Sequence, residues 1–207
     1  MSWKVSVEAT AFNSSQFPPD GVPEIAVAGR SNVGKSTLIN AILGSKLAYV
    51  GGTPGKTRSV NFYLVDTGTT SFRLVDLPGY GYAKRGKAER KAWSKLTSSY
   101  VENRGSLVLV CHLVDFRHGL LPNDRALQDW LLERGRSFMV LFTKADKISK
   151  GKRRSLLQQY VKDGLRSTDV PIVTSGEDRS GIEETRAFME NFVKRDRIDG
   201  VNHTFRS

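Results

Sequence analysis

The sequence predicts an α/β fold with a doubly wound, mostly parallel sheet of six strands and about five helices. The first observation is that short apolar runs alternate along the chain with longer segments whose apolar residues recur at helical spacing. The second is a pair of apolar runs separated only by the polar turn 66–70, which predicts a hairpin and hence one antiparallel strand. The third is the length of 207 residues, which fits one domain.

Each element follows from its residue pattern. The predicted strands are short apolar runs bounded by turn residues, at 24–28, 60–65, 72–75, 107–114, 138–142 and 170–173. The predicted helices have apolar residues three or four positions apart, at 35–43, 88–101, 123–133, 152–165 and 182–193. Residues 1–22 end in loop-forming residues and are interpreted as an N-terminal extension, 23–193 as the domain, and 194–207 as a frayed, polar and basic tail.

Composition excludes several classes of protein. Hydrophobic residues make up 39% of the chain, which excludes a disordered protein, and the single cysteine, Cys111, excludes a disulfide-bridged secreted domain. No apolar run reaches the length of a signal peptide or a membrane span, so we expect a cytoplasmic protein with no membrane partner. The formal net charge of +11 favours an anionic partner, although many surface lysines on an ordinary soluble protein would explain it too.

The first motif is a phosphate-binding loop. It has the form G-x-x-x-x-G-K-S, lies between a predicted strand and a predicted helix, and consists of Gly29, Arg30, Ser31, Asn32, Val33, Gly34, Lys35 and Ser36. The glycines let backbone N–H groups turn toward a phosphate, and Lys35 adds a positive charge. The Ser36 hydroxyl is a suitable ligand for Mg²⁺. The loop predicts nucleotide binding but does not choose between ATP and GTP.

Two further segments are assigned to Mg²⁺ and the γ-phosphate. The run Asp76, Leu77, Pro78 and Gly79 follows a predicted strand, where Asp76 would hold Mg²⁺ through water and the Gly79 N–H would sense the γ-phosphate. The glycine-rich segment 51–58 would order on the γ-phosphate, and Thr57 is the candidate second Mg²⁺ ligand, with Thr53 as the alternative. The alternative interpretation of this segment is an ordinary loop without a functional role. The other nucleotide contacts assigned in this segment and directly after it are Gly55, Lys56, Arg58 and Ser59.

A third motif selects the base. It consists of Thr143, Lys144, Ala145 and Asp146. The Asp146 carboxylate can accept both the N1–H and the N2 amine of guanine, a pair of donors that adenine lacks. The Lys144 stem can lie along the base, while Thr143 stands where asparagine is more common in such sites. Backbone N–H groups at Thr174, Ser175 and Gly176 would reach the guanine O6.

Together the motifs resemble one known family. Residues 29–36, 53–57 (TPGKT), 76–83 (DLPGYGYA), 115–118 (DFRH) and 143–146 (TKAD) are similar to those of the EngB/YihA/YsxC family of bacterial, translation-factor-type GTPases. The resemblance covers about residues 23–193, and a threonine at position 143 is usual in that family. It implies a doubly wound P-loop GTPase, or G domain, that uses Mg²⁺ and acts in assembly of the large ribosomal subunit. It also implies a role in normal cell division and septation.

The residues assigned to catalysis are Lys35, Thr57 and Gly79. Ras-like enzymes orient the attacking water with a glutamine where this chain has Tyr80, so we expect slow intrinsic hydrolysis that a partner or a cation completes. Asn32 would ligate K⁺ beside the phosphates, or would simply stabilise the loop. Asp115, Phe116, Arg117 and His118 are interpreted as a structural ion pair and loop anchor in preference to a catalytic relay, and His112 as a core histidine.

Basic residues cluster in three places, which are Lys84, Arg85, Lys87, Arg90, Lys91 and Lys95; Lys147, Lys150, Lys152, Arg153 and Arg154; and Lys194, Arg195 and Arg197. The first cluster would contact rRNA phosphates in a nucleotide-dependent way, or would be a solvated helix face. The predicted partners are GTP, GDP and the large ribosomal subunit with its rRNA, bound by a monomer. The alternatives are a GTPase acting on another RNA, a P-loop ATPase or kinase, and a nucleic-acid-binding module with a vestigial site.

Overall fold

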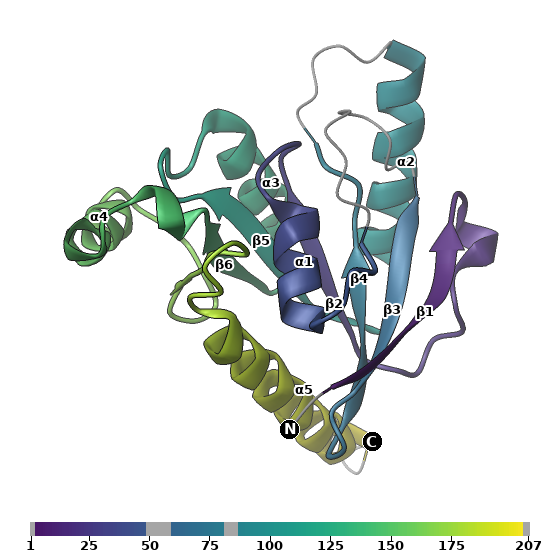
Figure 1. The fold of residues 1–207 in the computed structure, drawn as a ribbon. Coiled ribbons are helices and arrows are strands. Elements are labelled where there is room, and N and C mark those ends of the chain that lie inside the picture. The colour runs from purple at the N-terminus through teal and green to yellow at the C-terminus, as the bar shows by residue number, and fades with distance from the viewer. Residues whose placement is uncertain (1–2, 49–58, 81–86, 205–207) are drawn as a thin grey trace.

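Seven strands form one sheet in the order β1–β3–β4–β2–β5–β6–β7 in a computed structural model, which describes residues 3–48, 59–80 and 87–204 (Figure 1). The strands are β1 (Lys4–Ala11), β2 (Glu24–Gly29), β3 (Val60–Asp66), β4 (Ser71–Asp76), β5 (Leu107–Asp115), β6 (Phe138–Thr143) and β7 (Ile172–Val173). The described α-helices are α1 (Lys35–Leu43), α2 (Lys87–Asn103), α3 (Pro122–Glu133), α4 (Lys150–Lys162) and α5 (Ile182–Thr204). Two short 3₁₀ helices are η1 (Ser14–Gln16) and η2 (Ala145–Lys147).

Strand direction confirms the prediction of a single antiparallel member. β2 pairs in parallel with β4 and β5, and the parallel pairing continues through β6 to β7. β3 is antiparallel to both β4 and β1, so β1 runs in the same direction as the rest of the sheet. The α/β class is therefore confirmed, and the predicted count of six strands is one too few.

The missed strand is β1, which lies in the segment interpreted as an N-terminal extension. Its sequence alternates polar and apolar residues, but most of its residues are exposed because it is an edge strand. The pairing with β3 is interrupted by a bulge between Val7 and Ala9. Such a strand depends on its backbone partner more than on its own hydrophobicity, so a search for buried apolar runs passes over it.

Helix α5 also differs from its prediction. It continues to Thr204, where residues 194–207 were expected to fray. Lys194 pairs with Glu190 one turn earlier at 2.7 Å, and Arg197 donates to the carbonyl of Ser71 at 2.8 Å. Polar residues therefore extend this helix through contacts that an apolar pattern does not reveal. The other boundaries moved less, and α4 covers Lys150–Lys162 while β7 covers Ile172–Val173.

Alternate residues of β2 serve two separate cores. Ile25 and Val27 belong to the core that includes buried residues of α1 and α5. Ala26 and Ala28 belong to the opposite core, which includes residues of α2 and α3 and against which α4 packs. Helices therefore cover both faces of the sheet, as the doubly wound class requires. Among the described helices, none has the length and apolar character needed to cross a membrane.

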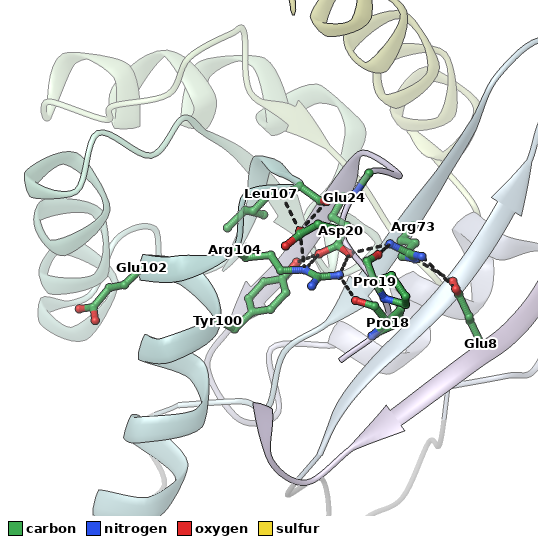
Figure 2. A network of polar contacts seen from close by, with 12 residues as sticks. Glu8, Pro18, Pro19, Asp20, Glu24, Arg73, Tyr100, Glu102, Arg104 and Leu107 are labelled. Atoms are coloured by element: carbon green, nitrogen blue, oxygen red, sulfur yellow. Dashed lines mark hydrogen bonds and ion pairs between the residues drawn. The ribbon is translucent and has the colours of Figure 1, made fainter. Parts of the chain in front are cut away.

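A buried ionic network fastens the amino end of β2 (Figure 2). The Glu24 carboxylate is fully buried and accepts hydrogen bonds from Arg104 Nε and Nη2 at 2.9 and 2.6 Å, from the Tyr100 hydroxyl at 2.8 Å and from Arg73 Nη1 at 3.2 Å. Arg73 also donates to both carboxylate oxygens of Glu8 in β1, at 2.8 and 2.9 Å. The network ties β1, β4 and the end of α2 to the central strand and leaves its carboxyl end for the site.

Candidate functional site

The predicted phosphate loop joins β2 to α1 in the required conformation. Gly34 has φ +98° and caps the N-terminus of α1, and Asn32 also has a left-handed φ of +64°. A Cβ on Gly29 would lie 2.9 Å from Val33 Cγ1 and 3.0 Å from Leu113 Cβ, so only glycine fits there without a shift. The first N–H groups of α1 point out of the helix, which is a suitable site for an anion.

Lys35 and Asp76 meet beneath this loop. Lys35 Nζ forms a buried ion pair with Asp76 Oδ1, which joins the first residue of α1 to the last residue of β4. Ser36 follows Lys35 in the first turn of the helix. Two of the residues assigned to phosphate and Mg²⁺ from sequence, Lys35 and Asp76, are thus in contact, and Ser36 is the next residue along the chain.

Two side chains of the base-recognition motif hold the phosphate loop in place. The Thr143 hydroxyl donates to the carbonyl of Val33 at 2.6 Å, and Lys144 Nζ donates to the carbonyl of Asn32 at 2.7 Å. Threonine therefore makes a loop-to-loop contact at the position where asparagine is more common in such sites. Lys144 itself has a left-handed φ of +60°. The two loops form a single unit because of these hydrogen bonds.

Asp146 faces a cavity of about 290 Å³ that is lined in part by Gly34, Thr37, Lys144 and Gly176. Burial raises the pKa of the Asp146 carboxyl, but hydrogen bonds from Ser175 and Lys147 outweigh burial and hold the pKa below its ordinary value. The carboxyl is thereby kept ionised, as the predicted recognition of guanine requires.

Ser175 has a role that the sequence did not reveal. Its hydroxyl donates to Asp146 Oδ1 at 2.7 Å and so orients the carboxylate. The Ser175 N–H donates to the carbonyl of Ser180 at 3.0 Å, and the Thr174 N–H to that of Phe142 at 2.7 Å. Of the three N–H groups predicted to reach the guanine O6, those two have acceptors already. Gly176 is the one whose N–H has no acceptor among the described residues.

The Asp115 cluster confirms the predicted ion pair and adds a contact. Asp115 accepts from Arg117 Nε and Nη2 at 2.9 and 2.7 Å. Its Oδ2 also lies 3.1 Å from Lys144 Nζ, so the same carboxylate holds the lysine of the base-recognition motif. Burial raises the pKa of Asp115, but hydrogen bonds from Arg117 and Lys144 hold it well below its ordinary value. His112 is fully buried and hydrogen-bonded, as expected of a core histidine.

Several predicted residues lie outside the described part of the chain. They are Thr53, Gly55, Lys56, Thr57, Arg58, Lys84 and Arg85, and the side chains of Lys87, Arg90 and Lys91 are likewise not described. Ser59 is described and buried, and its hydroxyl donates to Asn61 Oδ1 at 3.3 Å beside β3. In the second basic cluster, Lys147 pairs with Asp146 at 3.1 Å and Arg153 with Asp178 at 3.6 Å.

Three features together define the class of the protein, a P-loop GTPase. They are the phosphate loop, the buried Asp76 carboxylate that pairs with Lys35 of that loop, and a base-recognition loop that is hydrogen-bonded to the phosphate loop. A family model described as "50S ribosome-binding GTPase" matches residues 24–144, more than half of the chain. A protein named "Probable GTP-binding protein EngB" from Clostridioides difficile is 42% identical over 182 residues, which cover 86% of this chain and 87% of that protein. One of the same name from Streptococcus equi subsp. equi is 45% identical over 183 residues, 87% of this chain and 90% of that protein. The chain belongs to the EngB family of GTP-binding proteins.

Solved structures agree on the fold. A crystal structure of a probable GTP-binding protein engB aligns with a TM-score of 0.65 and 23% identity, over 83% of this chain and 99% of that one. Era in complex with MgGDPNP and nucleotides 1506-1542 of 16S ribosomal RNA aligns with a TM-score of 0.70 and 22% identity, over 84% of this chain but only 56% of that one. At these identities the likeness concerns the fold alone.

Proposed function

We propose that this GTPase binds GTP and GDP with Mg²⁺, hydrolyses GTP slowly, and acts as a nucleotide-dependent switch in assembly of the large ribosomal subunit. One observation carries the nucleotide part of the proposal. The phosphate loop and the base-recognition loop are joined through Thr143 and Lys144, beside a cavity that Asp146 faces. A guanine nucleotide would therefore meet a preformed site at both of its ends.

The residues present fit Mg²⁺. Ser36 offers a hydroxyl and Asp76 a buried carboxylate, and such hard oxygen ligands suit this cation. Thr57 remains the proposed second protein ligand, with Asp76 acting through water. When bound, Mg²⁺ would neutralise charge on the phosphate oxygens. The Lys35 ammonium, which now pairs with Asp76, would turn to the phosphates, and the Gly79 N–H would sense the γ-phosphate.

Slow hydrolysis follows from the placement of Tyr80. Its hydroxyl donates to Asp124 Oδ1 at 2.8 Å, within the protein, and a phenol so engaged does not orient a water as a glutamine would. We therefore expect a partner or a cation to complete catalysis. Asn32 is exposed on the phosphate loop, where its carboxamide oxygen would be accessible to K⁺. Comparison of GTPase rates in equimolar KCl and NaCl tests that point, and equal rates would remove K⁺ from the proposal.

The ribosomal part of the proposal is supported by three facts. The family model carries a ribosome-binding description, Era of the same fold is known in a complex with rRNA, and this chain has a net charge of +11, far more than one nucleotide needs. The roles in cell division and septation, and a cytoplasmic location, belong to the same proposal. Co-sedimentation with large ribosomal subunits at several salt concentrations, with a GTP analogue and with GDP, tests it. Binding that depends neither on the salt concentration nor on the bound nucleotide would contradict the proposal.

The test of the nucleotide part is a change of base specificity. Asp146→Asn should weaken GTP binding about a hundredfold, because the guanine donors lose their paired acceptor, and should favour xanthosine triphosphate. Asp129→Asn is the matched control, since Asp129 is an exposed aspartate of α3 that pairs only with Arg166 among the described residues. Competition among GTP, ATP and xanthosine triphosphate measures the outcome. Equal affinity of the wild-type protein for ATP and GTP would instead favour a P-loop ATPase or kinase.

A further inference from the structure

Tyr80 enters a buried polar network that the known chemistry of the site does not use. Its hydroxyl lies 2.8 Å from Asp124 Oδ1 and 2.8 Å from His112 Nε2. Asp124 in α3 is 1% exposed and His112 in β5 is fully buried. We call these three residues the Tyr80 network. It connects the residue after Gly79 to the centre of the sheet and to α3.

The hydrogen-bond directions in the network are determined by its chemistry. The ionised Asp124 carboxylate only accepts, so the Tyr80 hydroxyl must donate to it. The Tyr80 oxygen then accepts from the N–H at His112 Nε2. His112 Nδ1, at 3.3 Å from Gln128 Nε2, accepts from that amide. The Tyr80 hydroxyl therefore has an acceptor in Asp124 and a donor in His112, and these two contacts hold it in one orientation.

Burial raises the pKa of Asp124, but the nearby His112 ring, whose Nε2 lies 3.7 Å from Oδ1, and the hydrogen bonds from the Tyr80 hydroxyl and the Leu121 N–H hold the pKa below its ordinary value. Asp124 also fastens two neighbouring elements. Its Oδ2 accepts from the backbone N–H of Leu121 at 3.0 Å, at the start of α3, and lies 3.5 Å from Arg30 Nε in the phosphate loop. The carboxylate therefore contacts the phosphate loop, α3 and the Tyr80 side chain at the same time.

The backbone of Tyr80 is held against the phosphate loop by two more hydrogen bonds. The Tyr80 N–H donates to the carbonyl of Gly29 at 3.2 Å, and the Ser31 N–H donates to the carbonyl of Tyr80 at 2.9 Å. Gly79 is so close to this loop that a Cβ on it would lie 3.2 Å from the Ser31 nitrogen. In this arrangement the Ser31 N–H is satisfied by a protein carbonyl and is not offered to a phosphate.

We propose that Tyr80 and Asp124 are positioning residues that bias the nucleotide site toward GDP. The hydrogen bond between their side chains holds the backbone of Gly79 and Tyr80 where the Tyr80 carbonyl accepts the Ser31 N–H. The inference rests on the proposed function, in which Gly79 moves to sense the γ-phosphate. GTP would have to break the two backbone hydrogen bonds of Tyr80, whereas GDP, which has no γ-phosphate, would not. The tyrosine thus opposes the GTP-bound arrangement instead of replacing a catalytic glutamine.

The decisive variant is Tyr80→Phe in the full chain. It removes the hydroxyl that reaches Asp124 and His112 and keeps the ring. The affinity for a non-hydrolysable GTP analogue should rise at least about three- to tenfold relative to that for GDP, since the variant removes both hydrogen bonds of the hydroxyl and a single ordinary hydrogen bond contributes about that factor. Asp124→Asn, which keeps the shape but removes the charge, should shift the ratio in the same direction by less.

Tyr100→Phe is the matched control. Its hydroxyl also donates to a buried carboxylate at 2.8 Å, that of Glu24, but at the amino end of β2 (Figure 2). Both phenylalanine variants should lower the melting temperature, and Tyr80→Phe alone should change the ratio of the two nucleotide affinities. A folded Tyr80→Phe protein with the wild-type ratio, or with a ratio shifted toward GDP, would overturn the inference. If the wild-type protein bound neither nucleotide, the proposed function would fail first.

Discussion

The contact between Asp115 and Lys144 leads to a prediction about nucleotide affinity. Asp115→Asn removes the charge that holds Lys144 Nζ at 3.1 Å and receives two hydrogen bonds from the Arg117 side chain. The asparagine would present an NH₂ group to at least one of these cations, which are donors only. Lys144 would keep its hydrogen bond to the carbonyl of Asn32 and lose its second support.

The magnitude follows from burial. The Asp115 side chain is 4% exposed and that of Lys144 is 27% exposed, so their interaction lies between a surface pair and a fully buried one. Surface pairs contribute about 0–1 kcal/mol, and loss of one partner of a buried pair costs about 3–5 kcal/mol. A value of about 1.4 kcal/mol, discounted for the exposure of Lys144, corresponds to about a tenfold loss of affinity. GDP and GTP should lose affinity equally because the base-recognition motif serves both.

Equilibrium titration with fluorescent GDP and with a GTP analogue measures this loss, and single-turnover hydrolysis should proceed at the wild-type rate once the site is saturated. Asp20→Asn is the control. Asp115 accepts the Arg117 backbone N–H at 3.1 Å, and Asp20 likewise accepts that of Ser106 at 3.0 Å, remote from the site. A lowered melting temperature with unchanged nucleotide affinity would refute the reasoning and reduce Asp115 to a structural anchor.

The pH dependence of the free energy of unfolding provides a second test with the same variant, Asp115→Asn. The folded-state pKa of Asp115 is depressed, so its stabilising contribution is complete above its unfolded-state pKa, near 4, and is lost as the pH falls below that value. The stability difference between the wild type and Asp115→Asn should therefore be constant from pH 5 to pH 7 and shrink at lower pH. A difference that grew on acidification would contradict the assigned direction of the pKa shift.

Three other predictions follow. Glu24→Gln should lower the free energy of unfolding by about 3 kcal/mol, measured by urea denaturation without nucleotide, because Arg104 stays buried with less compensating charge; a loss below about 1 kcal/mol would contradict this. Burial raises the pKa of the Cys111 thiol to about 12. Iodoacetamide at pH 8 should therefore label Cys111 in the unfolded protein but not in the native protein, and rapid labelling of the native protein would contradict this prediction. Gly176→Ala would place a Cβ 2.8 Å from Thr37 Cγ2 and 3.0 Å from the Thr37 backbone. The variant should therefore weaken the binding of GDP and GTP together. Unchanged nucleotide titrations would contradict this and show that the cavity adapts to the added methyl group.

Much of the fold was predictable because buried parallel strands and packed helices leave strong local patterns. The helix predicted at 35–43 is α1 with the same bounds, and the predicted strands at 24–28 and 138–142 became β2 and β6 with one more residue each. β1 was not predictable in this way, since an exposed edge strand buries little apolar surface. The extension of α5 was missed for a related reason, because its last described contacts are polar ones such as Arg197 with Ser71.

In the site, too, the features built by contiguous residues were predictable from sequence and the contacts between distant residues were not. Gly34 and Lys35 could be assigned from spacing alone, because a phosphate loop is built by contiguous residues whose backbone angles depend on glycine. Two other contacts could not be assigned from sequence. They are the hydrogen bond from the Ser175 hydroxyl to Asp146 and the ion pair of Asp115 with Lys144, and each joins residues about 30 positions apart. Their common signal in the sequence is only that each partner follows the end of a predicted strand.

The sequence by itself determined the class of chemistry, a phosphate loop with a guanine-selecting motif, since both are short segments whose backbone and side chains act locally. The tertiary structure alone decided which way Tyr80 faces and what it contacts. Its partners His112 and Asp124 lie on different elements, β5 and α3, and meet it only because the sheet order places β5 beside β2. Such contacts depend on packing between distant segments, and no periodicity along the chain encodes that packing.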